Sequence, residues 1–105
     1  MSKLWSRCWS GEAEMRSTIT RKHIIFHGSV QGVGFRWRAR NAADLYGCTG
    51  WVHNKWDGTV EMEIQGEEEQ IDRVIQSIDS GRYVFIERMD VKTIPVEQEN
   101  GFRTR

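Results

Sequence analysis

The chain of 105 residues carries 15 basic and 15 acidic side chains, so its formal net charge is zero. Domains that bind nucleic acid are usually basic, so this balance argues against a nucleic-acid partner. The length suits a single domain. The longest apolar runs, such as Val84 to Ile86, are far shorter than the about 20 residues that span a bilayer, so we expect no membrane segment and a cytoplasmic location.

The neutral total hides an uneven distribution of charge. Residues 1–60 contain nine basic and four acidic side chains, whereas residues 61–105 contain six and eleven. The first half could therefore bind an anion even though the whole chain is neutral.

The cysteines and histidines do not suggest a metal centre. Cys8 and Cys48 lie 40 residues apart, which excludes a Cys-x-x-Cys pair, and we expect both to be free thiols in a reducing compartment. His23 and His27 fall in a predicted strand, where their Cα atoms would be ~13 Å apart, too far to share one metal ion. We therefore expect no metal and no cofactor.

The chain divides into an N-terminal appendage and a folded domain. Residues 1–18 are polar, and we expect them to be weakly ordered, although as a helix they would place Leu4, Trp5, Cys8 and Trp9 on one face. Met15 could be an alternative start. Residues 19–105 form the predicted domain.

Within that domain the apolar residues alternate between strand and helix periods. The predicted strands cover residues 21–28, 49–54, 59–65, 84–93 and a short closing stretch at 102–104. The predicted helices cover residues 35–46, ended by Gly47, and a second stretch from Glu67 to near Gly81. The order β-α-β-β-α-β predicts an α+β, ferredoxin-like sandwich, with an antiparallel sheet of four to five strands and two helices on one face.

The segment from Gly28 to Arg36, with the sequence Gly-Ser-Val-Gln-Gly-Val-Gly-Phe-Arg, joins the first strand to the first helix. Glycines allow successive N–H groups to form a concave anion site, and a helix N-terminus adds partial positive charge. Arg36 in the first turn would oppose the helix dipole unless an anion lay in front of it. The alternative is a tight turn without a ligand, followed by a solvated basic face of Arg36, Arg38 and Arg40. In either case we expect Arg38 and Arg40 to be solvated.

A second stretch, Gly47 to Gly58, completes a resemblance to a known family. Gly-x-Val-Gln-Gly-Val-x-Phe-Arg at 28–36, Ala43, Gly-x-x-Gly-Trp-Val-x-Asn at 47–54 and Asp-Gly-x-Val at 57–60 together resemble the acylphosphatase family. The resemblance covers about residues 21–105. It departs from the family pattern at Ser29, where the family often has a basic residue, and at Arg82, where it often has proline.

The resemblance implies metal-independent hydrolysis of acyl phosphates to a carboxylate and inorganic phosphate, which would be product and inhibitor. It implies that Arg36 and Asn54 are catalytic, with Asn54 holding an in-line water. It also implies that the phosphate is bound by Arg36 and by backbone N–H groups of the loop residues Val30, Gln31, Gly32, Val33, Gly34 and Phe35. We expect the protein to act on a small-molecule acyl phosphate and to be a monomer.

Taken without the loop, some of these residues have simpler explanations. Asn54 could be a turn former before Asp57-Gly58. Trp51 is expected to pack on the sheet, and Trp56 in the turn could border the mouth of the site. We expect His53 to lie on the surface.

Two other functions share parts of this pattern. An RNA-recognition domain has the same element order, but its aromatic residues lie on the third strand, and the stretch 59–65 has none. A non-catalytic module that binds phosphate or carbamoyl phosphate would have the same loop. Related modules occur inside larger proteins, so the short chain favours a freestanding enzyme.

Overall fold

A computed structural model describes residues 18–105 and contains five strands and two helices in that range. In chain order these are β1 (Ile19–Ser29), α2 (Phe35–Tyr46), β2 (Thr49–Asn54), β3 (Val60–Glu67), α3 (Glu68–Asp79), β4 (Phe85–Ile94) and β5 (Phe102–Thr104). The predicted order of elements is confirmed. The expectations for residues 1–17, including those for Leu4, Trp5, Cys8 and Trp9, lie outside the described residues.

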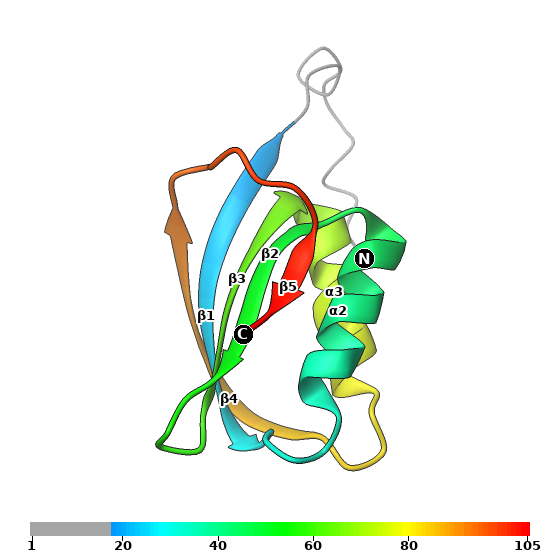
Figure 1. Ribbon diagram of the computed structural model, residues 1–105, viewed down its shortest axis with the longest axis vertical. Helices are drawn as coiled ribbons and strands as arrows, with labels where there is room; N and C mark the ends of the chain where they lie inside the picture. Colours follow the sequence, from blue (N-terminus) through cyan, green and yellow to red (C-terminus); the bar gives the residue numbers. More distant parts are fainter. Residues whose placement is uncertain (1–17) are drawn as a thin grey trace.

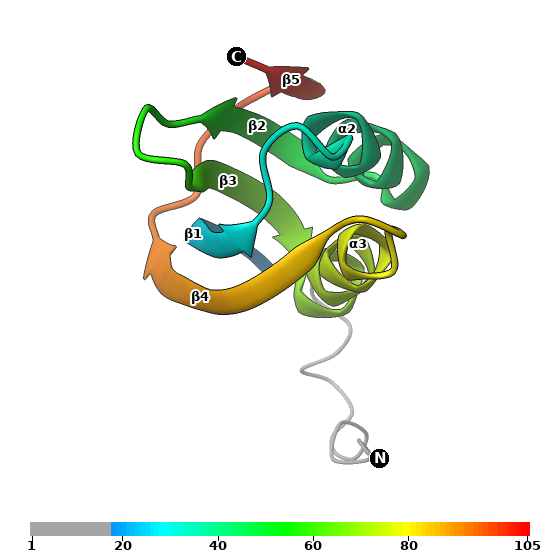
Figure 2. The ribbon, with the colours of Figure 1, turned by 90° about the horizontal axis from the view of Figure 1, so that it is seen from below.

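The strands form one sheet in the order β4-β1-β3-β2-β5, and both helices cover the same face of it (Figures 1 and 2). The predicted ferredoxin-like α+β class is therefore confirmed. Neither helix in residues 18–105 has the length and apolar character needed to cross a membrane.

The strand β5 pairs with β2 in parallel, whereas the four other strands pair antiparallel. The sheet is thus mixed, although an antiparallel one was predicted. The reason lies in the preceding loop, residues 95–101. It crosses from the end of β4 to the edge of the sheet where β2 begins, so β5 must start at the same end as β2 (Figure 1).

Local hydrogen bonds shift the predicted bounds of the third strand and of the second helix. Thr59 was expected to begin the third strand, but its N–H and its hydroxyl both donate to Asp57 Oδ1, at 3.0 and 2.6 Å, so it belongs to the turn. The strand β3 extends to Glu67, which pairs with Ile19 of β1 and forms a capping box with Gln70. The helix α3 therefore begins at Glu68 and ends at Asp79, two residues before Gly81.

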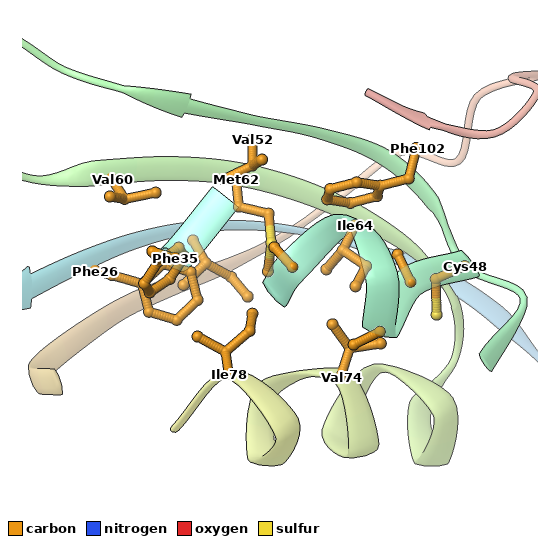
Figure 3. Packing of buried hydrophobic residues seen from close by; sticks show 14 of the residues in the cluster. Phe26, Phe35, Cys48, Val52, Val60, Met62, Ile64, Val74, Ile78 and Phe102 are labelled. Carbon is orange, nitrogen blue, oxygen red and sulfur yellow. The ribbon is translucent and has the colours of Figure 1, made fainter. Parts of the chain in front are cut away.

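The hydrophobic core lies between the sheet and the helices (Figure 3). Alternate strand residues face it, and α2 contributes Phe35 and three alanines that allow close approach to the sheet. The rings of Phe26 in β1 and Phe35 in α2 meet edge to face, with centroids 4.8 Å apart. This contact fixes the first turn of α2 against the end of β1.

We expect Gly50→Ala to destabilise the fold severely. A Cβ at Gly50 would lie 1.9 Å from the backbone oxygen of Glu63 in β3, at a φ of 139°. Because that oxygen belongs to the sheet and cannot move freely, the free energy of unfolding should fall by about 3 kcal/mol or more in urea denaturation. Gly47→Ala is the control, since its Cβ would meet only Gln70 Nε2 at 4.0 Å. It should cost about 1 kcal/mol for its left-handed backbone. Equal losses in the two variants would contradict the steric explanation.

We expect the Cys48 thiol to be unreactive in the folded protein. Burial raises its pKa to about 11 from an ordinary value of 9.0. At pH 8 only about one Cys48 in a thousand would be a thiolate. In a Cys8→Ser background, a disulfide reagent such as Ellman's should therefore label Cys48 slowly until urea unfolds the chain. Because folding raises this pKa, its contribution to stability should be lost as the pH rises from about 9 through 11. Rapid labelling of the native protein would contradict the burial of the Cys48 thiol.

Candidate active site

The loop between β1 and α2 is held at both ends by buried side chains. Val30 is fully buried and Phe35 is 2% exposed, while Gly32 and Gly34 between them are exposed. Both glycines adopt left-handed backbone conformations, with φ of 73° and 81°. A residue with a side chain would be strained there, so the glycines allow the chain to turn sharply between its two anchors.

The N-terminus of α2 has no cap from a side chain. Its N-cap is Gly34, and the first turn contains no acidic residue. Within residues 18–105, the N–H groups of residues 31 to 37 have no hydrogen-bond acceptor. The helix α3 differs, because its first turn has a capping box and the acidic residues Glu68 and Glu69. The start of α2 therefore presents free donors and the positive end of the helix dipole to solvent.

Arg36 lies beside these donors, and its side chain is exposed. Its Nη1 donates to the main-chain oxygen of Arg105, at 3.1 Å. Two further arginines follow on α2 and lie elsewhere. Arg38 is half-buried, with Nη1 3.5 Å from the oxygen of Ser77 near the end of α3, so the expectation of a solvated Arg38 is wrong. Arg40 is exposed, as expected.

Asn54 is the last residue of β2 and is half-buried. It lies on the same side of the strand as the buried Val52, which is the side covered by the helices. Its Oδ1 is buried and has no hydrogen-bond partner among residues 18–105. A buried acceptor without a partner costs free energy, so this atom is suited to accept a hydrogen bond from water or ligand.

The side chain of Gln31 joins the two parts of the site. Its Nε2 donates to the backbone oxygens of Lys55 and Thr59, at 2.6 and 2.8 Å. These residues flank the turn between β2 and β3 and follow Asn54 along the chain. The loop 30–34, the start of α2, which carries Arg36, and the end of β2, which carries Asn54, therefore lie at one end of the sheet (Figure 1). Sequence reasoning had assigned only the backbone of Gln31 to the site, and no local signal indicated this role of its side chain.

The aromatic residues near the site have different positions. Trp51 is half-buried on the open face of the sheet, the face without helices, and the Arg105 guanidinium lies 4.4 Å above its ring centre. Trp56 is 95% exposed in the turn after Asn54. The hydrogen bonds from Thr59 in the same turn lower the pKa of the Asp57 carboxyl.

The histidines lie on the surface of the sheet. His53 is exposed, as expected. His23 and His27 lie on β1, as predicted, and each pairs with a carboxylate. His27 Nε2 lies 2.9 Å from Asp90 Oδ2, and the hydrogen bonds of Asp90 with His27 and Arg88 lower the pKa of that carboxyl.

Comparison with known proteins shows the family of the chain. Residues 22–104 match the family model described as acylphosphatase. The acylphosphatase of Geobacillus kaustophilus is 40% identical over 82 residues, which cover 77% of this chain and 87% of that protein.

Solved structures agree with the family model. The structure of an acylphosphatase from Coxiella burnetii has a TM-score of 0.76 and 33% identity, and it covers 83% of this chain and 93% of its own. Full-length HypF in a phosphate- and nucleotide-bound form has a TM-score of 0.77 and 30% identity, covering 86% of this chain but 12% of that protein. The chain thus belongs to the acylphosphatase family, whose members hydrolyse acyl phosphates.

Proposed function

We propose that the protein hydrolyses acyl phosphates at the end of the sheet formed by the β1–α2 loop, Arg36 and Asn54. The observation that carries this proposal is the uncapped start of α2, where N–H groups without acceptors lie beside an exposed guanidinium. A phosphoryl group supplies the oxygen acceptors and the negative charge that such a site lacks.

In this mechanism the phosphoryl group is bound mainly by neutral donors. The N–H groups of Val30 to Phe35 and the guanidinium of Arg36 donate to its oxygens. Phosphoryl transfer passes through a loose transition state with negative charge on those oxygens, so donors already in place stabilise it without reorganising. Arg36 keeps its proton near neutral pH and has five N–H donors, of which one is directed at Arg105. The remaining donors are available to the substrate.

Asn54 holds the attacking water in line with the bond that breaks. Its Oδ1 accepts a hydrogen bond from the water, which gives this buried oxygen a partner. An amide can orient water without adding negative charge beside the phosphate, whereas an aspartate would repel the substrate.

The reaction needs neither a metal ion nor an acid from the protein. The water oxygen forms a bond to phosphorus, and the bond from phosphorus to the acyl oxygen breaks with its electron pair passing to the carboxylate. A carboxylate is a stable leaving group, so it does not need protonation. A proton of the water passes to the substrate's own phosphate, and inorganic phosphate is released as a product that competes for the same site. All residues with a role lie in one chain, so no second subunit is required.

A second candidate function is phosphate binding without turnover. The likeness to full-length HypF in a phosphate- and nucleotide-bound form favours it, because there a region similar to this chain makes up only 12% of a larger protein. Turnover of an acyl phosphate by the isolated chain distinguishes the two functions.

We expect both Arg36→Ala and Asn54→Ala to lower kcat/KM for a chromophoric acyl phosphate by about 100-fold or more, measured in EDTA. Arg36→Ala should also weaken inhibition by phosphate, since it removes a phosphate donor. Asn54→Ala should mainly lower kcat, since it loses only the water.

The matched controls are Arg40→Ala on the same helix and His53→Ala on the same strand, both at exposed positions. Both should keep the parent kinetics. Full kcat in Asn54→Ala would refute the role of Asn54, and loss of parent activity in EDTA would refute the metal-free reaction. Phosphate binding without any turnover in the parent chain would favour the second candidate.

We expect inorganic phosphate to stabilise the folded protein by binding at the start of α2. At ten times its Kd, phosphate should raise Tm by about 5 °C or more in differential scanning calorimetry. Chloride at the same ionic strength should produce no such shift, and neither should phosphate with Arg36→Ala. An equal shift in the parent and in Arg36→Ala would place the anion elsewhere.

A further inference from the structure

Arg21 is the only charged residue in 18–105 that is fully buried. It lies near the start of β1 and points to the open face of the sheet, away from Ile24 and Phe26 in the core. The catalytic loop follows the other end of the same strand. The proposed catalytic steps give Arg21 no part, so its burial needs another explanation.

Arg21 joins two strands to the loop that precedes β5. Its Nη2 lies 2.9 Å from Glu63 Oε1, and its Nη1 donates to Gln65 Oε1 at 3.1 Å, both on β3. The same Nη1 donates to Glu99 Oε1 in the loop 95–101, at 2.7 Å, and Nε lies 3.9 Å from Glu97 Oε2. We call these five residues the clasp: Arg21, Glu63, Gln65, Glu97 and Glu99.

Gln65 strengthens the clasp by pairing with the loop backbone. Its Nε2 donates to the oxygen of Glu97 at 2.7 Å, and its Oε1 accepts from the N–H of Glu97 at 2.9 Å. In the clasp, one guanidinium lies within 4 Å of the carboxylates of Glu63, Glu97 and Glu99. Burial lowers the pKa of Arg21, but the hydrogen bonds that it donates to Glu99 and Glu63 outweigh that effect and raise it. Without Arg21, the carboxylate of Glu63 would repel those of the loop.

The loop held by the clasp leads directly into β5, which has only three residues. Backbone bonds fix its two ends to β2: Gly50 N–H donates to Gly101 O at 3.1 Å, and Arg105 N–H donates to Val52 O at 2.8 Å. The main-chain oxygen of Arg105 then accepts from Arg36 Nη1. A short edge strand has few bonds of its own, so its position depends on how the preceding loop is anchored.

We propose that Arg21 is a positioning residue for phosphate binding. Through the clasp it holds the loop 95–101 and β5, and so keeps the oxygen of Arg105 where it orients the guanidinium of Arg36. The proposal rests on the function proposed for Arg36. It adds a second set of residues, at the opposite end of β1, on which the geometry of that site depends.

The test is a double-mutant cycle between Arg21 and Arg36. Arg21→Met removes the charge and keeps a long side chain, and Glu99→Gln loosens the clasp with a smaller change in case Arg21→Met does not fold. In the parent background, at a temperature where each variant is folded by circular dichroism, Arg21→Met should weaken phosphate binding and lower kcat/KM by about tenfold. In an Arg36→Ala background the same change should have little further effect on phosphate binding or kcat/KM. Arg21 acts on the substrate only through the guanidinium of Arg36, which this background lacks.

The control for general destabilisation is Val74→Ala, since Val74 is a core-facing residue of α3 outside the clasp. It should lower Tm and leave the phosphate Kd unchanged. A lower Tm with unchanged phosphate Kd in both clasp variants would make the clasp merely structural, and an equal loss in both backgrounds would show that Arg21 acts independently of Arg36. If Arg36→Ala itself keeps full phosphate affinity, the function proposed for Arg36 fails. In that case the coupling between the two arginines is overturned with it.

Discussion

The site depends on one constraint, which is that the helix α2 must begin without a cap. Free N–H groups at a helix start are normally satisfied by a side chain, as they are in α3 by the capping box of Glu67 and Gln70. At α2 the N-cap is Gly34 in a left-handed backbone conformation, and the first N–H groups of the helix have no acceptor within residues 18–105. The packing of Phe35 against Phe26 holds this helix start in place despite its open donors.

Side-chain bonds to distant backbone oxygens assemble the rest of the site around that helix start. Gln31 reaches the turn after β2, and Arg36 reaches the last residue of the chain. Each contact joins segments that are more than twenty residues apart in sequence. The proposed catalytic geometry is therefore a property of the whole sheet. In that geometry the contact between Arg36 and Arg105 depends on β5, a strand of three residues at the edge of the sheet.

The charged side chains of the chain lie in different surroundings, and only some of them are near the proposed site. Of the three arginines in the first half of α2, Arg36 lies at the open helix start, Arg38 approaches the end of α3 and Arg40 faces solvent. Three carboxylates of the acidic second half surround Arg21. The zero net charge is thus compatible with the proposed anion site, because that site would use one exposed guanidinium and a set of uncharged backbone donors.

The sequence by itself determined the order of elements and the bounds of α2, β2 and β5, because these follow from local periodicity and from glycine at the helix end. The motif also identified the family, and with it Arg36, Asn54 and the loop 30–35, whose catalytic roles stay predictions. Only the tertiary structure decided the parallel direction of β5, the side-chain role of Gln31 and the positions of Arg38 and Arg21. Arg21 looks like an ordinary polar strand position, and it is buried because a loop more than seventy residues later covers it. Contacts between such distant segments leave no local pattern from which they could be predicted.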